Sequence, residues 1–407
     1  MKHLKFILFL LVAVVCFSCS TDEILMPNQS TDSGIASDTH HISQKEALAI
    51  ANRILQKDTE LSRSIDHTPE FEYVLNEPKS RAESTLPDTL AYVINYPDNN
   101  GFAIISSENY IFPVLAFSES GQFTFENEIS KVNFIDCIGK YLAENKDSGS
   151  EGTGGISKWP ITPVDSVITP FFEGVEPIVR FRMNQRAPFN KYVDIEHPGC
   201  PVGCVAVSSA LLMSHSKSEF DYHGTKYYFS SILDALDRHD NSVEVTTDPN
   251  APVYTYEQAT DYMSKLVYDL GKDLDMSYST SRSAAFSTDA YDLIYDLGFE
   301  MADDFRLYNS INAAKYLLDN YIIYVSGSGH AWVIDGCKSA LFPFTDSNDN
   351  FTLDDPKLVY VHCDWGWGGL CNGYYSGDVF NTEAAKMGSF KPTNYFAVKI
   401  ETNNILQ

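Results

Sequence analysis

The segment KDSGSEGTGGISK, residues 146–158, limits how this chain can fold because it separates two regions of ordinary globular composition. It is rich in glycine and serine and has no apolar periodicity, which is typical of an exposed linker. The chain has 407 residues and is 44% hydrophobic, which is enough for two domains that each bury a core. We therefore expect a domain boundary at this linker, where proteases also cut readily.

The N-terminus has the pattern of an export signal. Lysines precede an apolar stretch over residues 6–15 that is too short to span a membrane, and the small residue Ser18 stands directly before Cys19. Residues 1–19 resemble a bacterial lipoprotein signal, in which Cys19 is acylated; cleavage by an ordinary signal peptidase is the alternative. We expect an exported outer-membrane lipoprotein at the cell surface, or an extracellular protein after processing.

Charge and cysteine content restrict the partners of the chain. Its net charge of −26 at pH 7 argues against nucleic acid or an anionic membrane surface, because phosphate groups are bound by clustered Lys and Arg. Contact with a membrane is therefore expected only through a lipid at Cys19. The cysteines after the signal are too sparse for a disulfide framework and lack zinc-ligand spacing, so no metal site is predicted.

The region before the linker, residues 20–145, has the pattern of a small α+β domain. Residues 42–55 predict an amphipathic helix, with Ser43 and Glu46 in capping-box spacing. Strand-like runs on both sides of the turn PDNNG follow, and the segment KVNFIDCIGKYLAEN predicts a closing helix. No catalytic constellation occurs in this region.

The region after the linker, residues 159–407, contains a candidate nucleophile. Cys204 follows the residues PVG and opens the apolar run VAVSSALLM, which predicts a buried helix. A cysteine at the start of a helix has its thiolate stabilised by free backbone N–H groups and the helix dipole. Cys200 lacks this advantage because Pro201 favours an extended backbone, so we expect it to be structural. The thiol alone leaves Cys204 open to interpretation as an ordinary buried cysteine.

A histidine partner would favour catalysis by Cys204. His215 is excluded because it lies about 16 Å along the same helix, at 1.5 Å per residue. His330 stands in IIYVSGSGHAWVIDG, where small neighbours such as Gly329 leave room for a substrate backbone beside the imidazole. A surface histidine at a strand end is the alternative interpretation.

Strand pairing predicts a third group. The segments HAWVIDG and KLVYVHCDW are strand-like and are joined by a polar loop, so they should pair antiparallel. This pairing predicts that His330 lies near Asp364, whose carboxylate would fix the imidazole tautomer and stabilise its cationic form. His362 is a lesser candidate for the base.

Three motifs resemble one known family. GCVAVSSALLM, GSGHAWVIDG and HCDWGWGGLCNGYY, in this order, resemble the streptopain family of papain-like cysteine proteases. The first domain, through AYVINYPDNNGFAIIS and PVLAFSESGQF, resembles the propeptide of that family. The resemblance implies an α+β, papain-like fold of two subdomains, in which a helical part carries the nucleophile and an antiparallel sheet carries the histidine. The resemblance also implies that an inhibitory α+β propeptide domain precedes this fold, that the substrates are proteins or peptides, and that no cofactor is required.

Carried over residue by residue, the resemblance implies the roles of the site. Cys204 is the nucleophile, and His330 is the general base and acid. Gln185 is an oxyanion donor beside the backbone N–H of the nucleophile. Trp365 and Trp367 form a wall of the substrate cleft; packing in the core is the alternative interpretation of both rings.

Two positions depart from the family's pattern. Asp364 stands where the family usually has Asn, so we expect its charge to make His330 more basic and to shift the pH profile. Met183 stands where Trp is usual.

The prediction is a secreted or surface-tethered cysteine endopeptidase, made as a zymogen and freed by cleavage in the linker. An inactive protease-like surface binding protein and a cell-wall peptide amidase or transpeptidase are the alternatives.

Overall fold

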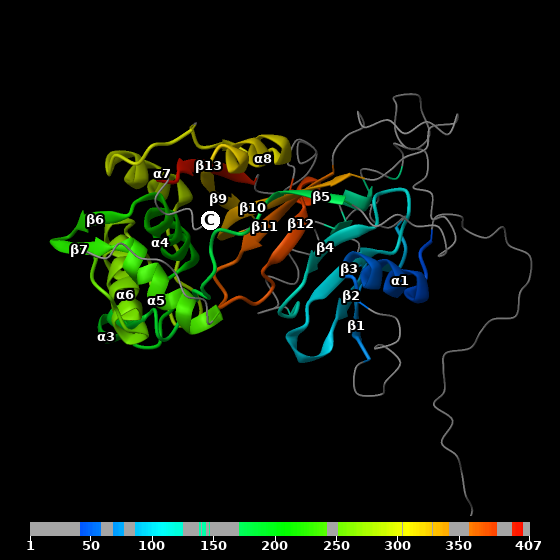
Figure 1. Cartoon of the computed structure of the whole chain (residues 1–407), viewed down its shortest axis with the longest axis horizontal. Coiled ribbons are helices and arrows are strands. Elements are labelled where there is room, and N and C mark those ends of the chain that lie inside the picture. The colour runs from blue at the N-terminus through cyan, green and yellow to red at the C-terminus, as the bar shows by residue number, and fades with distance from the viewer. Residues whose placement is uncertain are drawn as a thin grey trace, which may run out of the picture. The chain divides into compact units, whose positions relative to one another are not determined.

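The computed structural model describes the parts of the chain that carry the predicted motifs (Figure 1). These are residues 41–57, 68–76, 86–124, 138–139, 141–143, 146, 171–241, 251–302, 304–327, 329–341, 358–380 and 393–401. The signal pattern with Cys19, and the predicted linker after its first residue, lie outside the described residues. Within the described residues, no helix has the length and apolar character needed to cross a membrane.

The described part of the first domain is an antiparallel sheet covered by a helix. Its elements are α1 (Gln44–Ile54), β1 (Glu70–Leu75), β2 (Thr89–Asn95), β3 (Phe102–Ser106) and β4 (Val114–Ser118). Helix α1 begins with the predicted capping box, in which Ser43 accepts a hydrogen bond from Glu46 N–H and the Glu46 carboxylate accepts one from Ser43 N–H. The turn between β2 and β3 also lies where the sequence predicts it. Of the predicted closing helix, residues 138–139 and 141–143 are helical and the rest lies outside the described residues.

The strands of the first domain join those of the second in one sheet. The strand order is β1-β2-β3-β4-β12-β11-β10-β9-β13-β8, and β5 pairs with β10 off this path. Strand β4 meets β12 through the antiparallel pairs Phe117–Tyr374 and Ala116–Tyr375. The strands after β4 are β5 (Phe171–Val175), β8 (Arg306–Leu307), β9 (Tyr321–Gly327), β10 (His330–Leu341), β11 (Leu358–Asp364), β12 (Gly373–Ser376) and β13 (Asn394–Lys399).

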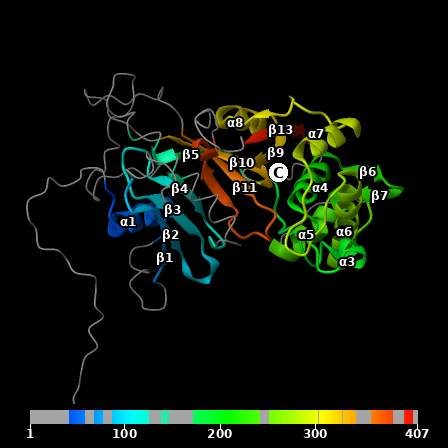
Figure 2. The same cartoon turned by 180° about the vertical axis from the view of Figure 1, so that it is seen from behind.

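Helix α4, which carries the candidate nucleophile, packs between the sheet and other helices of the second domain. Helix α4 (Cys204–Ser216) lies beside β10 on one side and α6 on the other, as Figure 2 shows from behind. The other described elements are α3 (Lys191–Glu196), the hairpin β6 (Glu219–Tyr222) and β7 (Thr225–Tyr228), α5 (Phe229–Asn241), α6 (Tyr256–Asp273), α7 (Ser287–Asp296), α8 (Ser310–Leu318) and the 3₁₀ turn Gly377–Phe380. The predicted buried helix that begins at Cys204 is confirmed.

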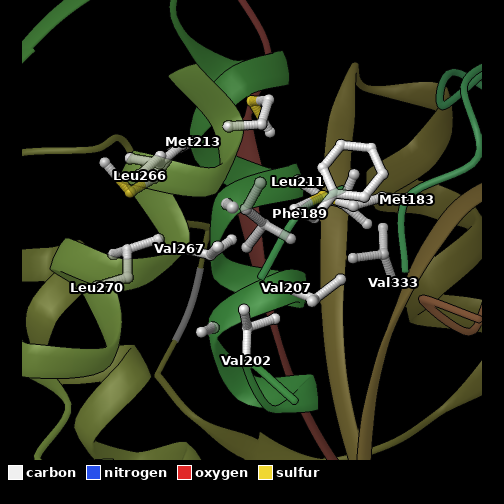
Figure 3. Close-up of a cluster of buried hydrophobic side chains, with 14 of the residues drawn as sticks. Met183, Phe189, Val202, Val207, Leu211, Met213, Leu266, Val267, Leu270 and Val333 are labelled. Atoms are coloured by element: carbon white, nitrogen blue, oxygen red, sulfur yellow. The ribbon is translucent and has the colours of Figure 1, made fainter. Parts of the chain in front are cut away.

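The packing around α4 explains why its sequence is apolar on every side. Val207 and Leu211 of α4 lie toward Val333 of β10, whereas Leu266 and Leu270 of α6 cover another side of the helix (Figure 3). Every residue of α4 after Cys204 is buried. A helix covered all round has no polar face, and its first residue is fixed in place by the packing of the turns that follow.

Candidate active site

The loop before α4 places the Cys204 thiol. Gly203 precedes the helix with φ of 91°, a conformation that favours glycine, and a Cβ there would lie 2.9 Å from Met276 Sδ. The Ser283 hydroxyl donates to the Pro201 carbonyl at 2.6 Å in a buried position. The chain therefore enters α4 in one fixed direction, and Cys204 is its first residue.

His330 meets this thiol from the first position of β10. The turn before it contains Gly329, which has φ of 82°, and the imidazole is hydrogen-bonded to Cys204. Burial raises the pKa of the Cys204 thiol, but the charge and hydrogen bond of His330, with the N–H groups of Ala331 and Cys204, outweigh burial and lower the pKa overall. A thiol whose pKa is lowered by an imidazole is a better nucleophile near neutral pH.

The other nitrogen of the imidazole is held by the main chain. His330 Nε2 lies 3.0 Å from the carbonyl oxygen of Trp365. A carbonyl can only accept, so Nε2 carries a hydrogen and Nδ1 is left for the thiol. The tautomer that a thiol–imidazole pair needs is therefore set by the backbone after β11.

The predicted position of Asp364 beside His330 is corrected by the register of the strands. Strands β10 and β11 pair antiparallel as predicted, but Asp364 is opposite Val333 and not opposite His330. Side chains alternate between the two faces of a sheet. Asp364 therefore lies on the same face as Val333, whereas His330, three residues before Val333, lies on the opposite face. The carboxylate instead accepts the N–H of Gly366 at 2.9 Å.

Three tryptophan rings surround the imidazole. The ring centroids of Trp367, Trp365 and Trp332 lie 4.9, 6.1 and 6.3 Å from that of His330. Trp332 and Trp365 are buried and pack 5.0 Å apart, whereas Trp367 is half-buried. Trp365 therefore packs in the core, and Trp367 is the more accessible ring beside His330. The sequence analysis missed Trp332, although its spacing of two from His330 on a strand signals the same face.

The predicted oxyanion donor lies on a segment that touches both loops of the site. The Gln185 carbonyl accepts from Val202 N–H at 2.9 Å, and the Met183 carbonyl accepts from Gly368 N–H at 2.8 Å. The Gln185 side chain is half-buried, and among the described residues no group is hydrogen-bonded to its amide. Gln185 is thus held by its backbone while its amide is free to bind another group. Met183 is fully buried.

The predicted lesser candidate, His362, is committed elsewhere. Its Nδ1 lies 2.6 Å from Asp335 Oδ1, and Asp335 Oδ2 accepts Val179 N–H at 2.8 Å. Asp335 is fully buried and His362 nearly so. These contacts make the pair a structural link between β10, β11 and the segment before α3.

The described cysteines differ in exposure. All are free thiols, and Cys204 is half-buried, whereas the others are buried: Cys200, Cys337, Cys363 and Cys371. The predicted structural character of Cys200 agrees with its burial.

Comparison with known proteins identifies the class of the second domain. Residues 183–375 match the model of the Peptidase C10 family. Residues 39–137 match the model described as Spi protease inhibitor. The matched segment from 183 to 375 is therefore a Peptidase C10 domain, and the predicted streptopain-family membership and papain-like α+β fold class are confirmed.

Individual relatives agree with the family match. Streptopain of Streptococcus pyogenes is 24% identical over 339 residues, which cover 73% of this chain and 76% of the relative. Streptopain of the serotype M1 of that species gives the same identity and coverage. A solved structure of a prointerpain A fragment from Prevotella intermedia covers 81% of this chain and 98% of its own, at 18% identity and a TM-score of 0.46. The two family matches thus place a Peptidase C10 segment after a segment that matches the inhibitor family.

Proposed function

We propose that this chain is an exported cysteine endopeptidase made as a zymogen, with Cys204 as its nucleophile and His330 as its general acid and base. The observation that carries the proposal is the thiol of Cys204, at the start of a buried helix, in hydrogen-bond contact with an imidazole whose other nitrogen is held by a carbonyl. That combination supplies both a nucleophile of lowered pKa and a proton donor in a fixed tautomer.

The proposed reaction is acyl transfer through a thioester. The Cys204 thiolate attacks the scissile carbonyl carbon, and the oxyanion is held by the amide of Gln185 and the backbone N–H of Cys204. The His330 imidazolium then donates its proton to the leaving amine. In the second half, neutral His330 takes a proton from water, the hydroxide attacks the thioester, and the thiol is released with the carboxylic acid product.

The first domain, residues 20–145, is proposed to inhibit the enzyme within the same chain. Support comes from the match to an inhibitor family and from the pairing of β4 with β12. Residues of the first domain also bond the loop beside the site, since Cys371 N–H donates to the Gln122 carbonyl at 3.3 Å. Cleavage within residues 146–158 would separate the domains, and a lipid at Cys19 would remain with the inhibitory part.

The test is intact mass against time for purified residues 20–407 under reducing conditions, with a Cys204→Ala version as the matched control. If only the unmodified chain is cut between Lys146 and Lys158, the thiol is the agent and the zymogen account stands. If both are cut alike, another protease is responsible. If neither is cut and added protein substrate also survives, the proposed peptidase activity is wrong.

A further inference from the structure

Three arginine side chains lie on the two segments that border the site. Arg182 and Arg186 flank the predicted oxyanion donor Gln185, and Arg282 precedes Ser283, whose hydroxyl bonds the loop before α4. All three arginine side chains are exposed, and we call them the arginine rim. A chain with a net charge of −26 therefore presents cations beside its candidate nucleophile.

The guanidinium groups of the arginine rim are not neutralised by the described carboxylates. Arg238 of α5, by contrast, forms an ion pair with Asp234 at 2.8 Å. Within the described parts of the chain, no carboxylate forms such a pair with the rim. Asp240 Oδ2 accepts the backbone N–H of Arg182 at 2.6 Å, so this carboxylate bonds the main chain and not the guanidinium. The positive charges of the rim are therefore available to a bound molecule.

Arg186 joins the two segments of the arginine rim. Its Nη1 donates to the Gly199 carbonyl at 3.2 Å, and its Nη2 donates to the Thr280 carbonyl at 3.3 Å. Both acceptors are neutral, so the hydrogen bonds fix the guanidinium without removing its charge. Arg186 therefore holds the loop before Cys204 against the segment of Arg282 and adds to the positive potential there.

Arg182 lies against the loop that follows Trp367. A Cβ on Gly369 would meet the Cγ and Cδ of Arg182 at 3.1 Å. The Trp367 ring lies 4.9 Å from that of His330, which protonates the leaving amine in the proposed reaction. The substrate residues after the scissile bond therefore pass beside Trp367. Residues two apart in a chain are separated by at most about 7 Å, so Arg182 is within reach of these substrate residues.

The first domain shows that a peptide chain can bind along the same loop. In the uncut chain the Gln122 carbonyl accepts the N–H of Cys371 at 3.3 Å. A Cβ on Gly121 would lie 3.8 Å from the Gly369 carbonyl. The loop therefore offers backbone groups to a neighbouring chain next to Arg182, and release of the first domain would free these groups for a substrate.

We propose that the arginine rim makes the enzyme select acidic peptides, with Arg182 binding a substrate carboxylate on the leaving-group side of the scissile bond. A guanidinium binds a carboxylate through two parallel hydrogen bonds, and a cleft lined by one sign of charge raises the local concentration of the opposite sign. Charges more than about 8 Å away are screened at physiological ionic strength, so the net negative charge of the chain opposes this binding only weakly. This inference rests on the proposed function, because it names the substrate class of the same site.

The experiment compares pairs of peptides with blocked ends that differ only in Glu or Gln at one of the first three positions after the scissile bond. The value of kcat/KM is measured for residues 20–407 after cleavage of the linker, and for Arg182→Gln treated alike. At one of these positions we expect the Glu peptide to be cleaved about two- to fivefold faster than the Gln peptide, which is the range for an exposed ion pair. Arg182→Gln should lower this ratio to about one, and Arg182→Lys should keep part of it.

The matched control is Lys315→Gln in α8, because it removes one exposed positive charge on an element that carries no group of the site. This variant should keep the ratio of the native enzyme. Equal rates for Glu and Gln peptides at all three positions would overturn the proposal, as would a ratio that survives in Arg182→Gln or falls equally in Lys315→Gln.

The peptides also separate this inference from the proposed function. Cleavage of Glu and Gln peptides alike shows an active peptidase without the proposed selectivity, whereas cleavage of neither overturns the peptidase activity and this inference with it. If Arg182→Gln does not fold, the native enzyme decides, because the ratio must fall toward one as NaCl is raised from about 0.05 to about 0.5 M. A ratio that does not change with salt would then overturn the proposal.

Discussion

The thiol side and the imidazole side of the site are held in place by different means. Cys204 is fixed by local features: a glycine with positive φ, a helix start and an apolar run that buries the helix. His330 is fixed by the carbonyl of Trp365, which stands 35 residues away in the sequence. The comparison shows that the nucleophile can be found from neighbouring residues, whereas the group that orients its partner depends on strand register.

The imidazole side of the site also contains more buried ionisable side chains than the thiol side does. Asp335, His362 and Asp364 all lie within the sheet behind the site, and Asp364 has a pKa raised to about 6 by burial. Buried carboxylates destabilise a fold unless they are bonded, so this arrangement has a cost that the thiol side does not share. We expect variants on the two sides to separate activity from stability.

The largest effect is expected from removing the imidazole. His330→Ala should lower kcat/KM on a peptide substrate by about 10⁴-fold, because thiolate formation and protonation of the leaving amine are lost together. The measurement is the steady-state rate after both chains have been cut in the linker by added native enzyme that is then removed, because His330→Ala is not expected to cut itself. His223→Ala is the control, since His223 is exposed and pairs with Asp273; an equal loss there would show that the effect is not specific to the site.

Removing the oxyanion donor should have a smaller effect. Gln185→Ala is expected to lower kcat by about 10²- to 10³-fold with little change in KM, because the negative oxygen develops only in the transition state. Rates over a range of substrate concentrations separate the two constants. A rise in KM at constant kcat would instead assign Gln185 to ground-state binding.

The charge on the imidazole side should appear as a pH dependence of stability. The carboxyl of Asp364 has an ordinary pKa near 3.8 and a pKa of about 6 in the fold, so the folded state binds the proton more tightly. Its contribution to stability is full below about pH 4 and is lost as pH rises through about 6, which lowers the free energy of unfolding by about 2–3 kcal/mol.

Asp364→Asn should remove this fall in the free energy of unfolding at neutral pH, because an amide does not ionise. Urea unfolding of the Cys204→Ala chain and of the same chain with Asp364→Asn, at pH 4.5 and pH 7, measures the difference. The account predicts that the variant gains stability relative to the parent as pH rises. Parallel curves for the two chains would contradict the raised pKa of Asp364.

One methyl group added at Gly203 should strain the backbone on the thiol side of the site. Gly203→Ala should lower the free energy of unfolding by about 1–3 kcal/mol, because φ of 91° disfavours alanine and the new Cβ meets Met276. Gly224→Ala is the matched control, since Gly224 has φ of 72° with no atom within 4 Å of a Cβ. Equal losses in both variants would show that φ alone, and not crowding at the helix start, sets the effect.

Local signals made much of the fold predictable. The capping box at Ser43, the turn between β2 and β3, and the helix that begins at Cys204 each depend on residues that are close in sequence. The antiparallel pairing of β10 with β11 also follows from two strand-like runs joined by a polar loop.

The orienting group of His330 could not be predicted in this way. The pairing argument placed the carboxylate of Asp364 beside the ring, but an irregularity between Ile334 and Gly336 and the actual register put Asp364 opposite Val333. The group that binds Nε2 is a main-chain carbonyl, which every residue possesses, so the sequence contains no signal for it. Only the three-dimensional course of the chain after β11 determines which carbonyl reaches the ring.

The most direct test of the account is the rate at which iodoacetamide modifies each cysteine as pH is varied, followed by peptide mass in residues 20–407 and in the same chain with His330→Ala. We predict that Cys204 reacts at pH 6 at least about tenfold faster than Cys200, and that His330→Ala abolishes this advantage. If Cys204 reacts no faster than the buried cysteines, or keeps its reactivity without His330, the thiol–imidazole pair is not the catalytic unit.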